Sequence, residues 1–289
     1  PPRSTLFPYT TLFRSPCPLA NALYPHPRTF PTRGIEPAHD SCLHSRMDWR
    51  SDCCVVIPCL NEALAIRDLV ARVLNHFSHI LVVDDGSTDG TGAFAQAAGA
   101  RLLRHHQPQG KGSALVHGWT TARQQGFTWA MTMDGDGQHA PDDLPAFLQC
   151  AEQTGARLIV GNRMAHPAGM PWLRRHVNRW MSRRLSQLAG FELPDTQNGF
   201  RLMHLDSWNN LTTTAGHFEI ESEILWRFAQ AGHPIQFIPV RVIYERERSK
   251  IHPLRDTLRW LRWYRQACRE SRTRSWQDHR PPPQKPHHR

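Results

Sequence analysis

Two aspartates separated by a single glycine, Asp134 and Asp136, lie in the stretch MDGDGQH. The residues FTWAMTM before them are apolar enough to form a buried strand, so the carboxylates follow a strand end in a glycine-rich turn. Carboxylates this close repel each other, and a divalent cation such as Mg²⁺ or Mn²⁺ between or beside them relieves that repulsion. A cation held by only two protein carboxylates keeps open positions that substrate phosphate oxygens can fill. A solvated turn is the alternative interpretation, and Asp-Gly pairs alone would favour it.

The elements that must position this turn are short apolar runs that alternate with amphipathic ones. Between the first two runs, apolar residues recur at helical spacing across residues 66–77, which predicts a helix. The alternation of strand and helix predicts an α/β fold with a mostly parallel sheet and helices on both faces. The predicted strands have the sequences CCVVIP, HILVVDD, RLLRH, FTWAMTMD and RLIVGNR.

Polar clusters follow three of these predicted strands: PCLNE at 58–62, DDGSTD at 84–89 and DGDGQ at 134–138. Because ligands of such sheets bind beyond the carboxyl ends of the strands, we expect the three clusters to meet along one edge. Two other nucleotide motifs are absent. No G-x-G-x-x-G follows the first strand, and GKGS has His105 and Gly112 where a P-loop needs glycine and a hydroxyl residue. The three clusters together favour a metal and diphosphate site over a solvated turn.

Composition and charge exclude several classes of protein. No apolar run approaches the roughly 18 to 20 residues that cross a bilayer. The seven cysteines form no C-x-x-C pair, which indicates reduced thiols rather than disulfides or a zinc site. The net charge of +10 comprises +3 in residues 1–46 and +9 in residues 246–289, which leaves −2 for the rest. The pI near 9.8 raises the hypothesis of a nucleic-acid-binding protein, but a body with no basic stripe argues against a nucleic-acid partner.

The expected domain boundaries follow from composition. Residues 5–15, TLFPYTTLFRS, look like the translation of a sequencing adaptor, and the proline-rich remainder to residue 46 has no periodicity. We therefore expect residues 1–46 to be a non-native or disordered leader, with Met47 as the natural start. The folded domain is expected at 47–250, a basic amphipathic helix at 251–275 and a disordered tail at 276–289.

From about residue 53 to residue 250 the chain resembles a family-2 glycosyltransferase of the GT-A fold, closest to the dolichyl- or polyprenyl-phosphate mannosyltransferase-like branch. Five motifs in order carry the resemblance: VVIPCLNE, VVDDGSTDGT, GKGSAL, MDGDGQHAPDDLP and DTQNGFRL. It implies a metal-dependent, inverting transfer of a hexose from a UDP- or GDP-sugar to a lipid-linked acceptor, most of all polyprenyl phosphate. It also implies a place at the cytoplasmic face of a bacterial plasma membrane.

The resemblance implies roles for individual residues. Asp136 and Asp134 would hold the metal, with Asp134 also contacting the nucleotide sugar, and both are catalytic candidates together with Asp195 and Glu221. Arg246 and Arg248 compete for the arginine position that precedes Lys250 in the family pattern. The implied donor-binding residues, besides Asp134, are Pro58, Leu60, Glu62, Asp85, Lys111, Gly135, Gln138, Arg163, Arg246, Arg248 and Lys250.

The acceptor decides whether the reaction needs a base. A lipid phosphate is already an anionic nucleophile, whereas a hydroxyl of a glycolipid, acyl-lipid or polysaccharide must lose a proton to a carboxylate. Asp195 and the acidic row Glu219, Glu221 and Glu223 are candidates for that base. The first turn of a helix explains the row equally well, because acidic residues are favoured there. A sugar-nucleotide-binding protein without catalysis is a further hypothesis, but the complete metal motif argues against it.

Two arginine-rich amphipathic stretches bear on the acceptor. Tryptophans beside arginines suit an anionic membrane surface, so we expect peripheral membrane contact. Both stretches could instead pack on the sheet, and for the first this alternative has equal weight. The apolar stripe of the first is Leu173, Val177, Trp180, Met181, Leu185 and Leu188, and that of the second is Leu254, Leu258, Leu261 and Tyr264 with Trp260 and Trp263 beside arginines.

Overall fold

The computed structural model describes residues 48–167, 169–243 and 253–278 of the chain. In the last of these ranges it describes side chains from residue 255 to residue 272. The expected leader 1–46, Met47 and residues 279–289 of the expected tail lie outside the described residues. So do three of the implied donor contacts, Arg246, Arg248 and Lys250.

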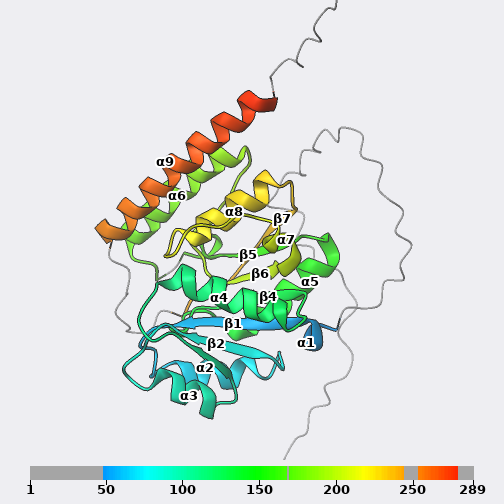
Figure 1. Ribbon diagram of the computed structural model, residues 1–289, viewed down its shortest axis with the longest axis vertical. Coiled ribbons are helices and arrows are strands. Elements are labelled where there is room, and N and C mark those ends of the chain that lie inside the picture. Colours follow the sequence, from blue (N-terminus) through cyan, green and yellow to red (C-terminus); the bar gives the residue numbers. More distant parts are fainter. Residues whose placement is uncertain (1–47, 168, 244–252, 279–289) are drawn as a thin grey trace, which may run out of the picture. The chain divides into compact units, whose positions relative to one another are not determined.

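Within the described residues, seven strands form one sheet in the order β3-β2-β1-β4-β6-β5-β7 (Figure 1). Every strand runs in the same direction except β6, which is antiparallel to both of its neighbours, β4 and β5. The prediction of a mostly parallel sheet is confirmed, whereas β6 and β7 were not among the predicted strands. The strands are β1 Cys53–Cys59, β2 Ile80–Asp84, β3 Arg101–Arg104, β4 Trp129–Thr132, β5 Leu158–Asn162, β6 Arg201–His204 and β7 Ile235–Pro239.

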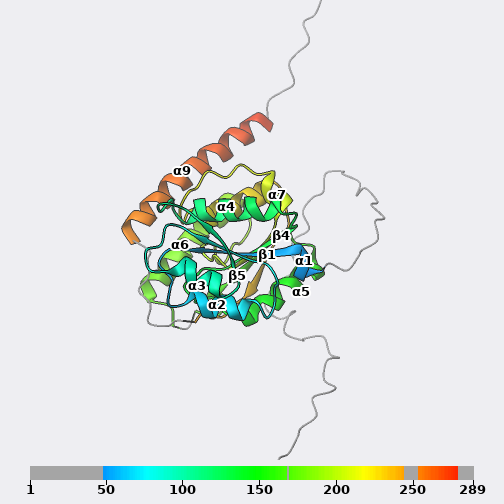
Figure 2. The same cartoon turned by 60° about the horizontal axis from the view of Figure 1, so that its bottom comes forward.

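Helices cover both faces of the sheet, as predicted (Figure 2). One face packs against α2, α3 and α5, where alternate residues of β1 such as Val55 and Ile57 meet Phe147 in one apolar cluster. The other face, with Val56 of β1, packs against α4, α6, α7, α8 and α9. The helices are α1 Trp49–Asp52, α2 Ile66–Val73, α3 Thr91–Ala97, α4 Lys111–Gln124, α5 Leu144–Thr154, α6 Trp172–Ala189, α7 Leu205–Asn209, α8 Ile220–Gln230 and α9 Pro253–Asp278, with short 3-10 turns at Pro141–Asp143 and Arg163–Ala165.

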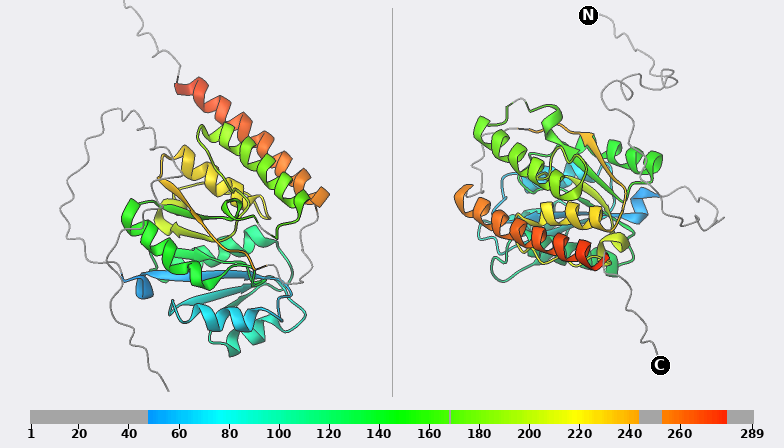
Figure 3. Two further views of the ribbon diagram at one scale, coloured as in Figure 1. Left: turned by 180° about the vertical axis from the view of Figure 1, so that it is seen from behind. Right: turned by 90° about the horizontal axis from the view of Figure 1, so that it is seen from above.

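The two arginine-rich stretches form α6 and α9, which lie side by side (Figures 1 and 3). The ring of Trp260 lies 5.3 Å from that of Trp180, and the Tyr264 hydroxyl donates to the carbonyl oxygen of Arg184 at 3.1 Å. Trp260 also donates its indole N–H to Ser222 of α8 at 2.9 Å. These contacts make α9 part of the apolar core on that face of the sheet.

The expectation that Trp260 and Trp263 of α9 serve a membrane surface is wrong. Trp260 is 2% exposed and Trp263 is 8% exposed, whereas Leu258 of the predicted stripe is 55% exposed. The buried face of α9 is therefore the one that carries Trp260, Trp263 and Ala267. The helix also continues to Asp278, beyond the predicted end at residue 275. No helix within the described ranges is both long and apolar enough to cross a membrane.

Candidate active site

The polar clusters that follow β1, β2 and β4 meet at one edge of the sheet, because these three strands are parallel neighbours. The backbone N–H of Asn61 donates to the Ser87 hydroxyl at 2.9 Å, and that of Glu62 donates to the Thr91 hydroxyl at 2.8 Å. On the other side, Gly135 lies so close to β1 that a Cβ there would stand 2.4 Å from the Cys59 sulfur. Glycine between the two aspartates thus lets the turn sit directly on the end of β1.

Lys111, Asp134 and Glu221 form what we call the lysine cluster. The Lys111 ammonium lies 2.6 Å from Asp134 Oδ1 and 2.7 Å from Glu221 Oε1. Burial lowers the pKa of Lys111, but the two carboxylates outweigh this effect and hold the pKa above its usual value. Burial likewise raises the pKa of Asp134, and the Lys111 charge reverses that shift and holds it well below its usual range. The cluster therefore carries one cation shared between two anions.

The cluster draws its members from distant parts of the chain. Lys111 begins α4 directly after Gly110, and Glu221 lies in the first turn of α8. A Cβ at Gly110 would clash with His217, and one at Gly112 would stand 2.5 Å from the carbonyl oxygen of Ala215. The two glycines of GKGS therefore allow the start of α4 to pack on the segment that leads into α8.

The turn that carries Asp134 and Asp136 fits a divalent cation. Asp134 Oδ1 is buried, and the Lys111 ammonium lies 2.6 Å from it. Asp136 Oδ1 accepts from the backbone N–H of Gln138 at 3.0 Å, which closes the turn. Among the described residues no three His, Cys, Asp or Glu side chains converge as metal ligands. Oxygen donors of this kind suit Mg²⁺ or Mn²⁺, and donor phosphate oxygens would complete the coordination.

His139 supports this turn, and Arg201 joins the segment before β6 to the start of α8; neither was singled out from the sequence. His139 Nδ1 accepts from the backbone N–H of Asp134 at 3.1 Å, and its ring stacks on Phe200. Burial lowers the pKa of His139, which favours the neutral ring that this acceptor role requires. Arg201 donates to the carbonyl oxygens of Asn198, Glu221 and Thr196, at 2.7, 2.6 and 3.2 Å. The only signal in the sequence was an arginine inside the apolar end of DTQNGFRL.

Arg163 and Asp195 form what we call the arginine pair. Asp195 is 0% exposed, and its Oδ2 accepts from the backbone N–H and the Nε of Arg163 at 3.0 and 2.8 Å. Its Oδ1 accepts from Arg163 Nη2 at 2.9 Å and from the backbone N–H of Gln197 at 3.3 Å. Burial raises the pKa of Asp195, but Arg163 reverses this and lowers it. A carboxylate bound in this way orients an arginine and is poorly suited to remove a proton.

The three glutamates of the acidic row have different contacts. Glu219 is the residue before α8, and Glu221 joins the lysine cluster. Glu223 is fully buried and accepts from the backbone N–H groups of Thr214 and Ala215 at 2.9 and 2.7 Å. Both Glu221 and Glu223 lie in the first turn of α8. Glu223 fixes the chain before α8, whereas Glu221 pairs with Lys111.

The remaining implied donor contacts lie at the same edge. Pro58 is buried in β1, whereas Leu60, Glu62 and Gln138 are half-buried at the rim. Asp85 is buried and accepts from the backbone N–H groups of Gln109 and Gly110 at 2.9 and 2.8 Å. The edge thus combines carboxylates, a lysine and an arginine with partly open apolar and polar side chains, an arrangement suited to a nucleotide diphosphate.

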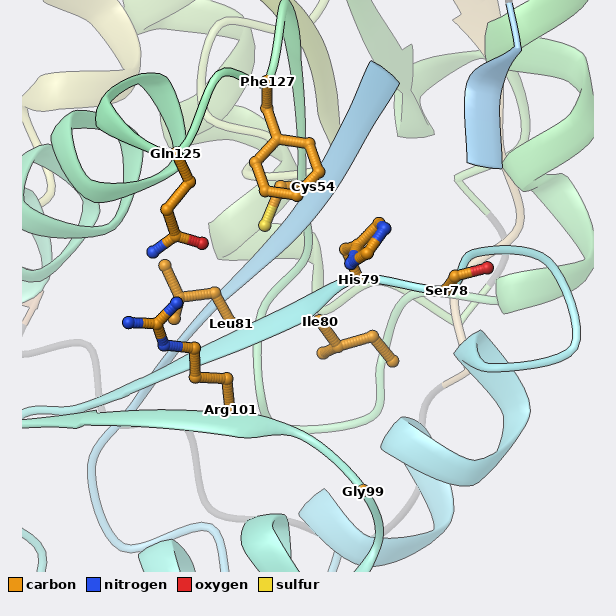
Figure 4. Close-up of a pocket in the computed structure, with 9 residues that line it drawn as sticks. All are labelled: Cys54, Ser78, His79, Ile80, Leu81, Gly99, Arg101, Gln125 and Phe127. Carbon is orange, nitrogen blue, oxygen red and sulfur yellow. The ribbon is translucent and has the colours of Figure 1, made fainter. Parts of the chain in front are cut away.

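A hollow lies at the opposite edge of the sheet, at the amino ends of β1, β2 and β3 (Figure 4). Arg101 and Gln125 line one side of it and His79 another, with Cys54 and Phe127 above. Burial raises the pKa of Cys54 to about 12, so its thiol is a poor nucleophile. Ligands of parallel sheets bind at the carboxyl ends of the strands, which favours the edge that carries Asp134.

Comparison with known proteins agrees with this geometry. A sequence model described as Glycosyl transferase family 2 matches residues 54–211. Glycosyltransferase AglJ of Haloferax volcanii is 30% identical over 74% of this chain and 71% of its own length. Polyprenol monophosphomannose synthase of Mycolicibacterium smegmatis is 29% identical over 64% of this chain and 75% of its own.

Among solved structures, glucosyl-3-phosphoglycerate synthase from Mycobacterium tuberculosis, in complex with Mn²⁺, UDP and phosphoglyceric acid, superposes with a TM-score of 0.58. Its sequence is 22% identical, and the match covers 76% of this chain and 78% of that one. At this identity the likeness concerns the fold, and it confirms the predicted GT-A architecture.

Proposed function

Because this chain belongs to glycosyltransferase family 2, we propose that it transfers a hexose from a nucleotide-diphosphate sugar to polyprenyl phosphate, with inversion at the anomeric carbon. The observation that carries the proposal is the lysine cluster, in which Lys111 pairs with Asp134 and Glu221 at the carboxyl edge of the sheet. In the reaction, an acceptor oxygen bonds to the anomeric carbon. The bond from that carbon to the donor diphosphate breaks, and the nucleoside diphosphate leaves.

The site is suited to stabilise the leaving diphosphate. Mg²⁺ or Mn²⁺ held by Asp134 and Asp136 would neutralise charge that builds on the phosphate oxygens. Arg163 adds a positive charge whose direction is already set by Asp195, so little reorganisation is needed as the charge develops. We assign the nucleoside to the rim lined by Pro58, Leu60, Glu62 and Asp85, and the sugar and its phosphates to Asp134, Gly135, Gln138 and Arg163.

The acceptor proposal rests on the state of two of the candidate bases, Asp195 and Glu221. Both oxygens of Asp195 are bound to Arg163, and Oε1 of Glu221 is bound to Lys111. A phosphate acceptor needs no base, so it is compatible with carboxylates that are already engaged. The name of the mycobacterial relative, a polyprenol monophosphomannose synthase, describes a product of that kind. The alternative is a hydroxyl acceptor with Glu221 as its base, and the position of Glu221 in the lysine cluster favours it over the other carboxylates.

We further propose that α6 and α9 contact an anionic membrane surface. At the start of α6, Trp172 is 73% exposed and Leu173 is 52% exposed, and Leu258 projects from α9. Exposed arginines lie on the same two helices, and exposed apolar groups together with arginines favour the headgroup region of a membrane. The exposed arginines on the two helices are Arg183, Arg184, Arg255, Arg262, Arg265, Arg269 and Arg272.

A transfer assay on the full chain tests the proposal. UDP- and GDP-hexoses would be supplied with Mn²⁺ or Mg²⁺, with and without polyprenyl phosphate. We expect metal-dependent transfer to the lipid that Asp136→Asn abolishes. Asp142→Asn is the matched control, because Asp142 is an exposed carboxylate shortly after the same turn. Metal-dependent donor hydrolysis without lipid transfer would exclude the proposed acceptor, and no donor turnover or binding would exclude the proposed site.

A further inference from the structure

Asp85, His105 and His117 form a hydrogen-bonded series that we call the histidine chain. Asp85 Oδ1 lies 2.7 Å from His105 Nδ1, and His105 Nε2 lies 2.9 Å from His117 Nδ1. The planes of the two rings differ by 4°. Asp85 and His105 are buried, whereas His117 is exposed on α4. The chain therefore connects solvent to a buried carboxylate at the edge of the site.

The buried end of the histidine chain holds the turn before Lys111. Asp85 accepts the backbone N–H groups of both Gln109 and Gly110. Gly110 has a φ of 103°, which side chains rarely allow, and it is the residue directly before α4. Because α4 begins at Lys111, the position of the Gln109 and Gly110 backbone determines where the Lys111 side chain lies relative to Asp134 and Glu221.

The hydrogen-bond inventory of histidine fixes how protons are arranged along the chain. Ionised Asp85 can only accept, so His105 Nδ1 must carry a proton. If His105 is neutral, its Nε2 accepts and His117 Nδ1 donates; if His105 is charged, its Nε2 donates and His117 Nδ1 accepts. Both arrangements keep every hydrogen bond. A second proton breaks the chain, because N–H groups of both rings would then face each other.

We propose that His105 and His117 are positioning residues that act on Lys111 through Asp85. The proposal rests on the proposed function in one respect, since it takes Lys111 to act on the donor. Loss of the chain frees Asp85 to move, loosens the turn at Gln109 and Gly110, and weakens nucleotide binding without removing any group that contacts the nucleotide. The chain also makes this position dependent on pH.

The direction of the pH dependence follows from the charges around the chain. Burial, and next the neighbouring charge of His105, lower the pKa of His117 below 6.5. The intact chain is therefore fully present above about pH 6.5 and is lost as the pH falls below it. The titratable and charged groups near it include Asp84 at the end of β2, Asp85 after it, Arg104 at the end of β3, His106 after it, Lys111 on α4 and His217 before α8.

Hydrogen exchange on the full chain tests the proposal without any nucleotide. His117→Ala removes the exposed end, whereas His117→Asn keeps an amide near the position of Nδ1 that does not titrate. At pH 7.5 we expect the amides of Gln109 and Gly110 to exchange about fivefold faster in His117→Ala, the effect of one hydrogen bond, and at the wild-type rate in His117→Asn. As the pH falls through the lowered pKa of His117, the wild type should lose protection that His117→Asn retains. Thr120→Ala, an exposed substitution one turn along α4, is the matched control.

Calorimetry with UDP or GDP and Mn²⁺ completes the test. We expect His117→Ala to weaken nucleotide binding about fivefold at pH 7.5 and His117→Asn to restore it. Equal exchange rates and equal affinities in wild type and His117→Ala would overturn the inference and leave the proposed function standing. If the wild type bound neither nucleotide, the proposed function would fail, and the exchange rates would still decide whether the histidines hold the turn.

Discussion

The lysine cluster and the arginine pair are both ion pairs at the carboxyl edge of the sheet, but they are satisfied differently. In the arginine pair each oxygen of Asp195 accepts two hydrogen bonds, and both side chains are sealed from solvent. In the lysine cluster one ammonium serves two carboxylates, and Asp134 keeps 27% of its side chain exposed. The lysine can exchange partners when a cation or a phosphate arrives, whereas the arginine cannot do so without leaving a buried charge.

This difference predicts that substitutions in the lysine cluster and in the arginine pair have different effects. Removing one member of a sealed pair leaves its partner charged and buried, which destabilises the fold strongly. Removing one carboxylate of the lysine cluster leaves Lys111 with the other. Substitutions in the cluster should therefore act mainly on the reaction, and substitution of Asp195 in the arginine pair mainly on folding.

The largest effect is expected from Asp134→Asn. We expect the transfer rate to fall by roughly three orders of magnitude, because a metal-binding carboxylate beside the leaving diphosphate is lost. The free energy of unfolding should change by no more than about 1 kcal/mol, because Glu221 still pairs with Lys111. Steady-state kinetics and urea unfolding measure the two quantities. A loss of several kcal/mol of stability would show that the cluster is as sealed as the arginine pair.

The next effect concerns Asp195→Asn, which removes the charge that balances Arg163. We expect the free energy of unfolding to fall by about 3 kcal/mol at pH 7. Because the pKa of Asp195 is lowered in the folded protein, its stabilisation is present above the carboxyl's ordinary pKa and is lost as the pH falls below it. The variant should therefore lose less stability than the wild type between pH 5 and pH 3, where both are measured by urea unfolding. An unchanged stability at pH 7 would contradict the comparison.

The sheet and its polar rim could be predicted because their signals are local. Apolar runs indicate β1, β2, β4 and β5. Parallel strands bring their carboxyl ends to the same edge of the sheet, whatever segments connect them. The strands β6 and β7 were not predicted: RLMH has only two apolar residues between polar ends, and Gln236 interrupts IQFIP. Their pairing with β4 and β5 supplies what their own sequences do not.

The division of the acidic row and the buried face of α9 could not be predicted, because distant residues decide both. Glu221 and Glu223 are two positions apart, and their different tasks depend on where Lys111 and the segment at Thr214 come to lie. Likewise, Trp260 is buried because α6 and α8 pack against it. Helical periodicity identifies an amphipathic helix, but it does not identify the elements that will cover each side.

A smaller effect, from Glu221→Gln, sharpens the role of the lysine cluster in acceptor choice. If the acceptor is a phosphate, the substitution removes one partner of Lys111 and should lower the transfer rate only about tenfold. If Glu221 is the base for a hydroxyl acceptor, the loss should be 10²- to 10⁴-fold, with the loss of one ionisation from the pH–rate profile. Rates with polyprenyl phosphate across pH 5 to 9 distinguish the two, and a loss above 100-fold would contradict the phosphate proposal.

The smallest effect is expected from substitutions on the exposed surface of α6 and α9. Trp172→Ser should weaken binding to vesicles with anionic lipids about fivefold, because part of one large apolar side chain no longer enters the headgroup region. Phe94→Ser removes an exposed aromatic ring from α3, away from both helices, and is the matched control. Neither substitution should change the free energy of unfolding by more than about 0.5 kcal/mol, because surface side chains contribute little to it. Vesicle sedimentation at low and high salt measures the binding. Equal losses of vesicle binding in both variants would show that α6 has no specific role in membrane contact. A loss confined to Trp172→Ser would show that membrane contact depends on the exposed surface of α6 and not on the lysine cluster or the arginine pair.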